Sequence, residues 1–197
     1  MKSKYACLVA SVLMSVPLTA HASIIWSAGP SDITFSKAAF ADFTLAANQD
    51  RITGNVWITR GATQGIFNFV TESAYNIEIS TGATDHVSPQ GTEWAFSSLN
   101  GNPTFAYGTG AANHASYVFS DWETAAQGGG PPFPSNLTNN AAVLHLIPDD
   151  IYVDLKFTDW GVGSGAGGSF VYTRAVPEPA TLSLLALGGL ALIRRRS

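Results

Sequence analysis

Short segments in which apolar and polar residues alternate run through the middle of the chain, separated by turn-forming residues. The two clearest are residues 75–79 and 151–158, in which every second residue is apolar. An alternation with a period of two is typical of a strand that buries one face. About eight to ten such segments, with no convincing long helix between them, predict an all-β fold, a single β-sandwich or jelly-roll-like domain.

The remaining predicted strands are shorter or less regular. They are residues 33–35, 43–45, 51–59, 66–70, 93–96, 116–122, 143–147 and 170–174. Gly54-Asn55 interrupts residues 51–59 and suggests a bulge or hairpin there. Residues 36–47 can instead form a short helix that Ser36 would cap. Residues 127–140 contain three glycines, three prolines and three asparagines and predict a loop, and the glycine-rich residues 161–168 predict a flexible hairpin loop.

The first 22 residues have the pattern of a signal peptide. Lys2 and Lys4 provide the positive start, and an apolar or small-residue run follows from position 6 to 18. Ala20 and Ala22 are small residues at the spacing that signal peptidase requires, which predicts cleavage before Ser23.

The last 22 residues also have three parts. The motif Val176-Pro177-Glu178-Pro179-Ala180-Thr181 leads into an uncharged apolar run that continues to Ile193, and Arg194, Arg195 and Arg196 follow. The two prolines favour an extended, enzyme-accessible motif, whereas the apolar run predicts a helix in lipid. Its fourteen residues reach about 21 Å, which is short for a permanent anchor. The three arginines predict a cytoplasmic C-terminus.

This order of motif, apolar segment and basic end resembles the PEP-CTERM sorting signal of Gram-negative envelope proteins. The resemblance implies processing by an exosortase-type membrane enzyme, after transient anchoring in the inner membrane. The predicted organisation is therefore a signal peptide at 1–22, a β-sandwich ectodomain at 23–175 and a sorting segment at 176–197.

The ectodomain itself resembles, more weakly, a recurring ectodomain of PEP-CTERM proteins over roughly residues 50 to 175. The matching segments are Arg60-Gly61, residues 65–68, residues 93–95, residues 150–160 and residues 168–172. This resemblance implies a fold and a destination but no chemistry.

Composition narrows the possible functions. Cys7 is the single cysteine and lies in the predicted signal peptide, so the mature chain can form no disulfide and has no thiolate for catalysis. Between positions 23 and 176 there are five basic and thirteen acidic residues. A net charge near −8 repels phosphate backbones and argues against a nucleic-acid partner.

No catalytic motif, metal site or cofactor site stands out. Glu72 with Glu78, or Asp121 with Glu123, could form a glycosidase pair. Asp121 and Glu123 are two positions apart in a predicted strand, so their side chains would lie on the same face. Three other ligands lack the motif spacing or the structural context that they need. They are calcium at Asp149, Asp150 and Asp154, zinc at His86, His114 and His145, and a dinucleotide at the glycines of 163–168.

Aromatic side chains offer a binding alternative. Trp94, Trp122 and Trp160 could stack on sugar rings if they are exposed, and Trp160 is expected to be partly exposed because it adjoins the glycine loop. The preferred hypothesis is an exported, non-enzymatic protein of the cell surface or extracellular matrix. The alternative is a secreted carbohydrate-binding module or polysaccharide hydrolase.

Overall fold

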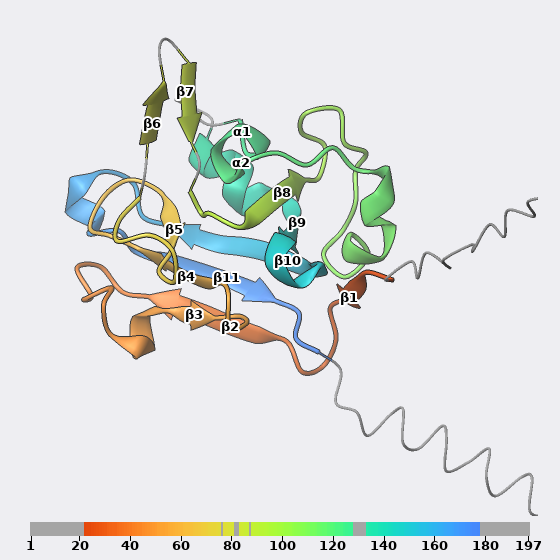
Figure 1. Ribbon diagram of the computed structural model, residues 1–197, viewed down its shortest axis with the longest axis horizontal. Helices are drawn as coiled ribbons and strands as arrows, with labels where there is room; N and C mark the ends of the chain where they lie inside the picture. The colour runs from red at the N-terminus through yellow and green to blue at the C-terminus, as the bar shows by residue number, and fades with distance from the viewer. Residues whose placement is uncertain (1–21, 76, 81–82, 87, 128–132, 178–197) are drawn as a thin grey trace, which may run out of the picture.

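The protein is mostly β-sheet with few helices, as its alternating sequence predicts (Figure 1). The computed structural model describes residues 22–177 except 76, 81–82, 87 and 128–132, and it leaves the side chains of 77–80 and 83–86 undescribed. None of the helices in this described part is long and apolar enough to cross a membrane.

The main sheet has six strands around the long central strand β10 (Ile151–Trp160). Its order is β2-β11-β10-β9-β8, and β1 joins β10 in parallel. The other strands of the sheet are β1 (Ile24–Trp26), β2 (Ile33–Lys37), β8 (Thr92–Phe96), β9 (Ala141–Leu146) and β11 (Phe170–Arg174). From β8 to β11, strands that are consecutive in sequence are neighbours in the sheet and form an antiparallel meander. A sandwich or jelly roll would need two sheets packed face to face, and this arrangement stays a prediction.

Two smaller antiparallel sheets accompany the main one. The first consists of β3 (Asp50–Arg51), β4 (Trp57–Arg60) and β5 (Ile66–Asn68). The second is the hairpin of β6 (Ile77–Ser80) and β7 (Ala83–His86), which projects from the rest of the domain in Figure 1.

One apolar core joins the main sheet, the three-stranded sheet and the helices. It contains Trp94, Leu144 and Phe157 from the main sheet and Ile58 and Ile66 from the three-stranded sheet, all fully buried. The predicted apolar face of residues 151–158 is confirmed, because Ile151, Val153, Leu155 and Phe157 are all buried in this core. Ile77 was assigned to the same kind of face, but its side chain lies outside the described residues.

Three local predictions are wrong. Residues 116–122 do not form a strand: a 3-10 helix (Ala111–Ser116) ends there and α1 (Trp122–Ala125) begins, with only a single bridge between Ser120 and Trp94. Residues 133–139 form α2 (Phe133–Asn139) inside the predicted loop, because the apolar side chains of Phe133 and Leu137 pack against the core. Residues 43–45 are a turn before a 3-10 helix (Ala46–Asn48), so neither the strand nor the longer helix predicted there forms.

Candidate functional site at the processing end of the domain

The two ends of the domain leave it next to each other. β1 pairs with residues 151–153 of β10, and β11 pairs with residues 155–160 on the same edge. The N–H of Ile24 donates to the carbonyl of Asp150, and the N–H of Ala175 donates to the carbonyl of Asp154. Asp150 and Asp154 are four residues apart, which is about 13 Å along an extended strand, so the two chain ends contact the sheet within about that distance of each other. Figure 1 shows β1 and the C-terminal end of β11 on the same side of the domain, which we call the processing end.

Asp154 organises the processing end from inside the sheet. Its side chain is fully buried, and its carboxylate accepts the backbone N–H of Ala111 at 2.8 Å and that of Ala28 at 3.3 Å. Burial raises the pKa of Asp154, and the backbone hydrogen bonds oppose this shift. Asp154 therefore fixes the segment after β1 and the start of the 3-10 helix Ala111–Ser116 through its side chain. Through its backbone carbonyl it also fixes Ala175, the last buried residue of the domain.

A buried ionic cluster fixes the end of β11. Arg174 donates from Nε to Oδ2 of Asp50 at 2.6 Å and from Nη2 to Oδ1 at 2.8 Å, which is a bidentate pair. The Tyr172 hydroxyl donates to the same Oδ2 at 2.6 Å. Burial lowers the pKa of Arg174, but the hydrogen bonds and charge of Asp50 outweigh it and the net shift is upward. Strand β3 is thereby tied to the base of the C-terminal tail.

The N-terminal side of the processing end is held by a second aspartate. The hydroxyl of Ser23, the predicted first residue after signal cleavage, donates to Oδ2 of Asp150 at 3.1 Å. Nε2 of His145 lies 3.4 Å from Oδ1 of the same carboxylate. The ring of His145 stacks on Tyr152 with centroids 4.1 Å apart. Ser23 is therefore held against the edge of the sheet.

The transition from folded domain to sorting tail takes only two residues. Ala175 is fully buried, Val176 is half-buried and Pro177 is exposed. The rest of the predicted sorting motif (Glu178, Pro179, Ala180 and Thr181), the basic stop (Arg194, Arg195 and Arg196) and Ala20 of the signal cleavage site lie outside the described residues.

The three tryptophans predicted as ligand contacts are core residues. Trp94 is fully buried, Trp122 is 1% exposed and Trp160 is 9% exposed, so the expected exposure of Trp160 is wrong. Trp122 and Trp160 lie with their ring centroids 5.2 Å apart, and Phe133 of α2 packs edge-on against both. The physical reason is that their large apolar area is more favourably removed from water than presented to it.

The two ends of the glycine loop are packed against their surroundings, residues 162–165 between them are exposed, and the loop does not present Trp160 to solvent. Arg60 lies 3.6 Å above the ring of Trp160 and donates from Nη1 to the carbonyls of Gly161 and Ser169 at 3.0 and 2.8 Å. At Gly168, which has a φ of +66°, an added Cβ would lie 1.7 Å from the carbonyl oxygen of Gly61. Glycine is required there both by the backbone conformation and by this close approach.

We expect Trp160→Phe to lower the free energy of unfolding by about 1–2 kcal/mol, through lost core contacts and a weaker cation–π interaction in a desolvated site. The matched control is Trp57→Phe, because Arg51 lies 4.0 Å over Trp57 at a half-exposed position. Urea unfolding of both variants measures the difference. Unchanged stability with weaker retention on cell polysaccharide would restore a surface role for Trp160.

The candidate carboxylates have structural partners. Asp121 caps α1 by accepting the N–H of Thr124 at 2.9 Å, so it does not share a strand face with Glu123. Glu123 accepts the hydroxyl of Tyr75, and Glu72 accepts the N–H groups of Asn68 and Gln90 at 2.8 and 2.9 Å. The side chain of Glu78 lies outside the described residues.

The predicted metal alternatives find no cluster in the part of the chain that the structure describes. Asp149 accepts from the Thr53 hydroxyl at 2.6 Å and from Nδ2 of Asn55 at 2.7 Å, so it joins two loops. Asp154 is buried under backbone donors, and Nδ1 of His114 lies 2.9 Å from the carbonyl oxygen of Ala111. The side chain of His86 is undescribed.

One pocket of about 350 Å³ lies beside the base of the β6–β7 hairpin. Its lining residues are Thr71, Glu72, Ser73, Ala74, Tyr75 and Gln90. Burial raises the pKa of Tyr75, and the hydrogen bond and charge of Glu123 add to the shift, followed by the charges of Asp121 and Glu72. The pocket is therefore polar and acidic in its surroundings.

Comparison with known proteins identifies the tail. Residues 175–197 match the model of the PEP-CTERM protein-sorting motif, which confirms the resemblance seen in the sequence. The motif implies export, transient anchoring in a membrane and processing by an exosortase-type enzyme. No curated protein and no solved structure matches the chain.

Proposed function

We propose that this chain is an exported, non-enzymatic component of the cell surface or extracellular matrix, delivered by its PEP-CTERM tail. The observation that carries the proposal is the start of the sorting motif at the last buried residue of the domain, Ala175. The folded domain is therefore directly attached to the segment that would direct its export and processing. Signal peptidase would remove residues 1–22 and the exosortase-type enzyme would remove the apolar run, leaving the C-terminus near the processing end.

The occupied carboxylates support a non-enzymatic role. A general acid or nucleophile must reach a substrate, whereas Glu72 and Asp121 already accept backbone hydrogen bonds that hold loops and a helix. Extracellular polysaccharide is a partner that such a passive component could contact.

Intact mass measurement on envelope and culture-medium fractions tests the proposal. We expect a species that begins at Ser23 and ends within the sorting segment, with any attached group seen as added mass. A protein found only at full length in the cytoplasm would contradict it.

The pocket at Glu72 and Tyr75 favours a second candidate, a secreted polysaccharide-binding module or hydrolase. Incubating the protein with the producing cells' polysaccharide decides between the two. Release of sugar that is lost in Glu72→Gln and in Glu123→Gln, in variants that circular dichroism shows to be folded, would establish the enzyme, whereas no release is expected from the non-enzymatic component.

A further inference from the structure

Three isoleucines are exposed at the processing end. Ile24 is 52% exposed, Ile25 36% and Ile33 38%. Ile24 and Ile25 begin β1, and Ile33 begins β2 in register with Arg174, the last residue of β11. All three therefore lie where the chain enters and leaves the domain. Successive residues of a strand point to opposite faces, so Ile24 and Ile25 place apolar side chains on both faces of the sheet at this end. Exposed apolar side chains at one end of a domain mark a contact with a partner or a membrane.

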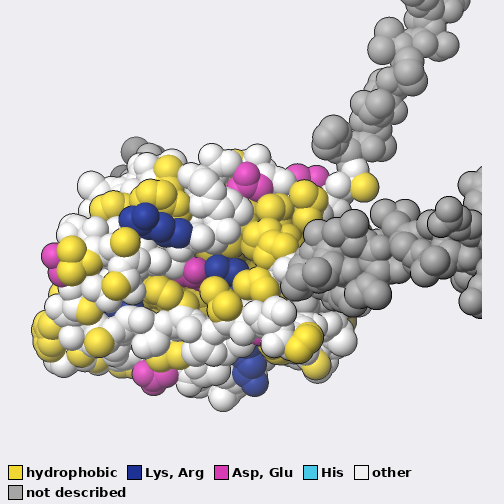
Figure 2. Space-filling model, turned by 90° about the horizontal axis from the view of Figure 1, so that it is seen from below, with side chains coloured by type: hydrophobic (Ala, Val, Ile, Leu, Met, Phe, Trp, Pro, Cys, Tyr) yellow, Lys and Arg dark blue, Asp and Glu magenta, His cyan; other side chains and the backbone are white. Residues whose placement is uncertain are grey.

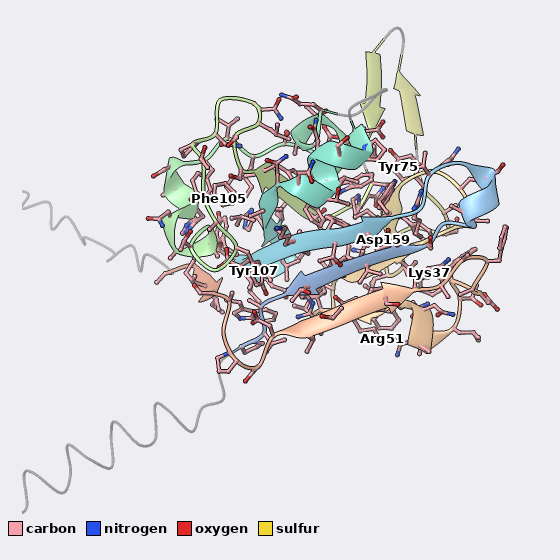
Figure 3. All side chains as sticks on the ribbon, turned by 180° about the vertical axis from the view of Figure 1, so that it is seen from behind. Lys37, Arg51, Tyr75, Phe105, Tyr107 and Asp159 are labelled. Carbon is pink, nitrogen blue, oxygen red and sulfur yellow. The ribbon has the colours of Figure 1, made fainter. Side chains whose placement is uncertain are left out.

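Amphipathic aromatic residues accompany these isoleucines. Trp26 is half-buried at the end of β1, and the hydroxyl of Tyr107 donates to Oδ2 of Asp32 at 2.5 Å, one residue before Ile33. Figure 3 shows Tyr107 toward the processing end, whereas Lys37 and Asp159 lie toward the other end. Tyrosine and tryptophan are enriched where protein meets the membrane–water interface.

Hydrophobic side chains are also exposed on the face of the domain that is seen from below. Figure 2 shows them around a few charged side chains on this face. Asp32 and Asp150 lie near the chain ends, through their hydrogen bonds with Tyr107 and Ser23, so contact of the processing end through apolar side chains is favoured over attraction to anionic groups.

The length of the connecting chain brings the processing end to the membrane. Four residues lie between the buried Ala175 and Ala180, the first residue of the apolar run. Fully extended, the five steps from Ala175 to Ala180 span at most about 17 Å, whereas the headgroup layer is itself about 5–8 Å thick. An anchored chain therefore holds the processing end within about 10 Å of the headgroups.

We propose that Ile24, Ile25 and Ile33 form a membrane-contacting rim, which rests in the headgroup layer of the phospholipid bilayer that holds the tail. The rim depends on the anchoring function of the tail and adds a defined orientation to it, with the main sheet standing on its processing end. Side chains of this kind lie at the boundary between headgroups and acyl chains when they contact a bilayer.

Fluorescence quenching by labelled lipids tests the orientation. The chain without its predicted signal peptide, residues 23–197, which contains no cysteine, is reconstituted in vesicles of phosphatidylethanolamine and phosphatidylglycerol that carry a headgroup nitroxide. Single cysteines at Ile25→Cys or Ile33→Cys receive an environment-sensitive dye. The matched control is Val162→Cys, an exposed valine (65%) in the loop between β10 and β11 at the opposite end of the sheet. Circular dichroism checks that each variant is folded.

We expect quenching at positions 25 and 33 to exceed that at 162 by about threefold or more, and to be insensitive to salt because the rim is apolar. Equal quenching at the three positions would overturn the proposal. Self-quenching between dyes that does not depend on the nitroxide would also overturn it and assign the rim to a second copy of the chain. The test needs neither export nor processing enzyme, so its failure leaves the proposed surface function standing.

Discussion

Asp50→Ala is expected to lower the free energy of unfolding of residues 23–177 by about 3–5 kcal/mol. Asp50 is 5% exposed and is the acceptor for both Arg174 and the Tyr172 hydroxyl. Without it, a guanidinium and a phenol are left buried, and the desolvation of the charge is no longer offset. Urea-induced unfolding, followed by the fluorescence of the buried tryptophans, measures the change.

The matched control is Asp159→Ala, because Asp159 is an exposed aspartate of β10 toward the other end of the sheet. Its effect is expected to stay within about 0.5 kcal/mol. The double variant Asp50→Leu with Arg174→Met should recover much of the loss, since an apolar pair of similar volume replaces the ions. A loss below about 1 kcal/mol in Asp50→Ala would mean that water reaches Arg174 and that the cluster does not fix the tail.

Local pattern predicted the central strand because its alternation and its burial have the same cause. Leu155 and Phe157 point into the core, and the period of two in the sequence reflects that face. The same alternation places Asp154 on the opposite face, which it predicts to be polar and solvated, but Asp154 is fully buried. The 3-10 helix covers that face and supplies the Ala111 N–H that the carboxylate needs. A partner 43 residues away leaves no trace in a local alternation.

The regions that were predicted wrongly are those in which packing overrides local preference. Glycine and proline between 128 and 134 favour a loop, yet Phe133 and Leu137 share one side of α2 and join the core. Residues 116–122 are aromatic and β-branched, but the Asp121 cap starts a helical turn and only Ser120 bridges to the sheet. Tertiary contacts decide such short segments.

The candidate site divides in the same way. The sorting motif was predictable because it is a contiguous residue pattern at the end of the chain. The buried ionic cluster before the motif was not predictable, since Asp50 and Arg174 are 124 residues apart and nothing in the local sequence marks them as partners. The proximity of the two chain ends likewise follows only from the pairing of β1 and β11 with one edge of β10.

Replacing Pro177, Glu178 and Pro179 together by alanine is expected to abolish processing of the tail and to leave the full-length segment in the inner membrane. Pro177 is exposed two residues after the buried Ala175, so an enzyme can reach the motif only where the chain leaves the domain. Proline restricts the backbone to extended conformations, whereas alanine would let a helix extend back toward the domain. Immunoblotting of membrane and medium fractions, with intact mass, measures the retained species.

The matched control is Pro30→Ala, an exposed proline between β1 and β2 that lies outside the tail. It should be processed and distributed like the parent chain, because it changes proline content without changing the motif. The folded domain should remain intact in both variants, since its last buried residue is Ala175 and the Asp50–Arg174 pair precedes the substituted positions. If the triple variant is trimmed and sorted like the parent, the enzyme does not read Pro-Glu-Pro, and the apolar run with its three arginines must carry the address alone.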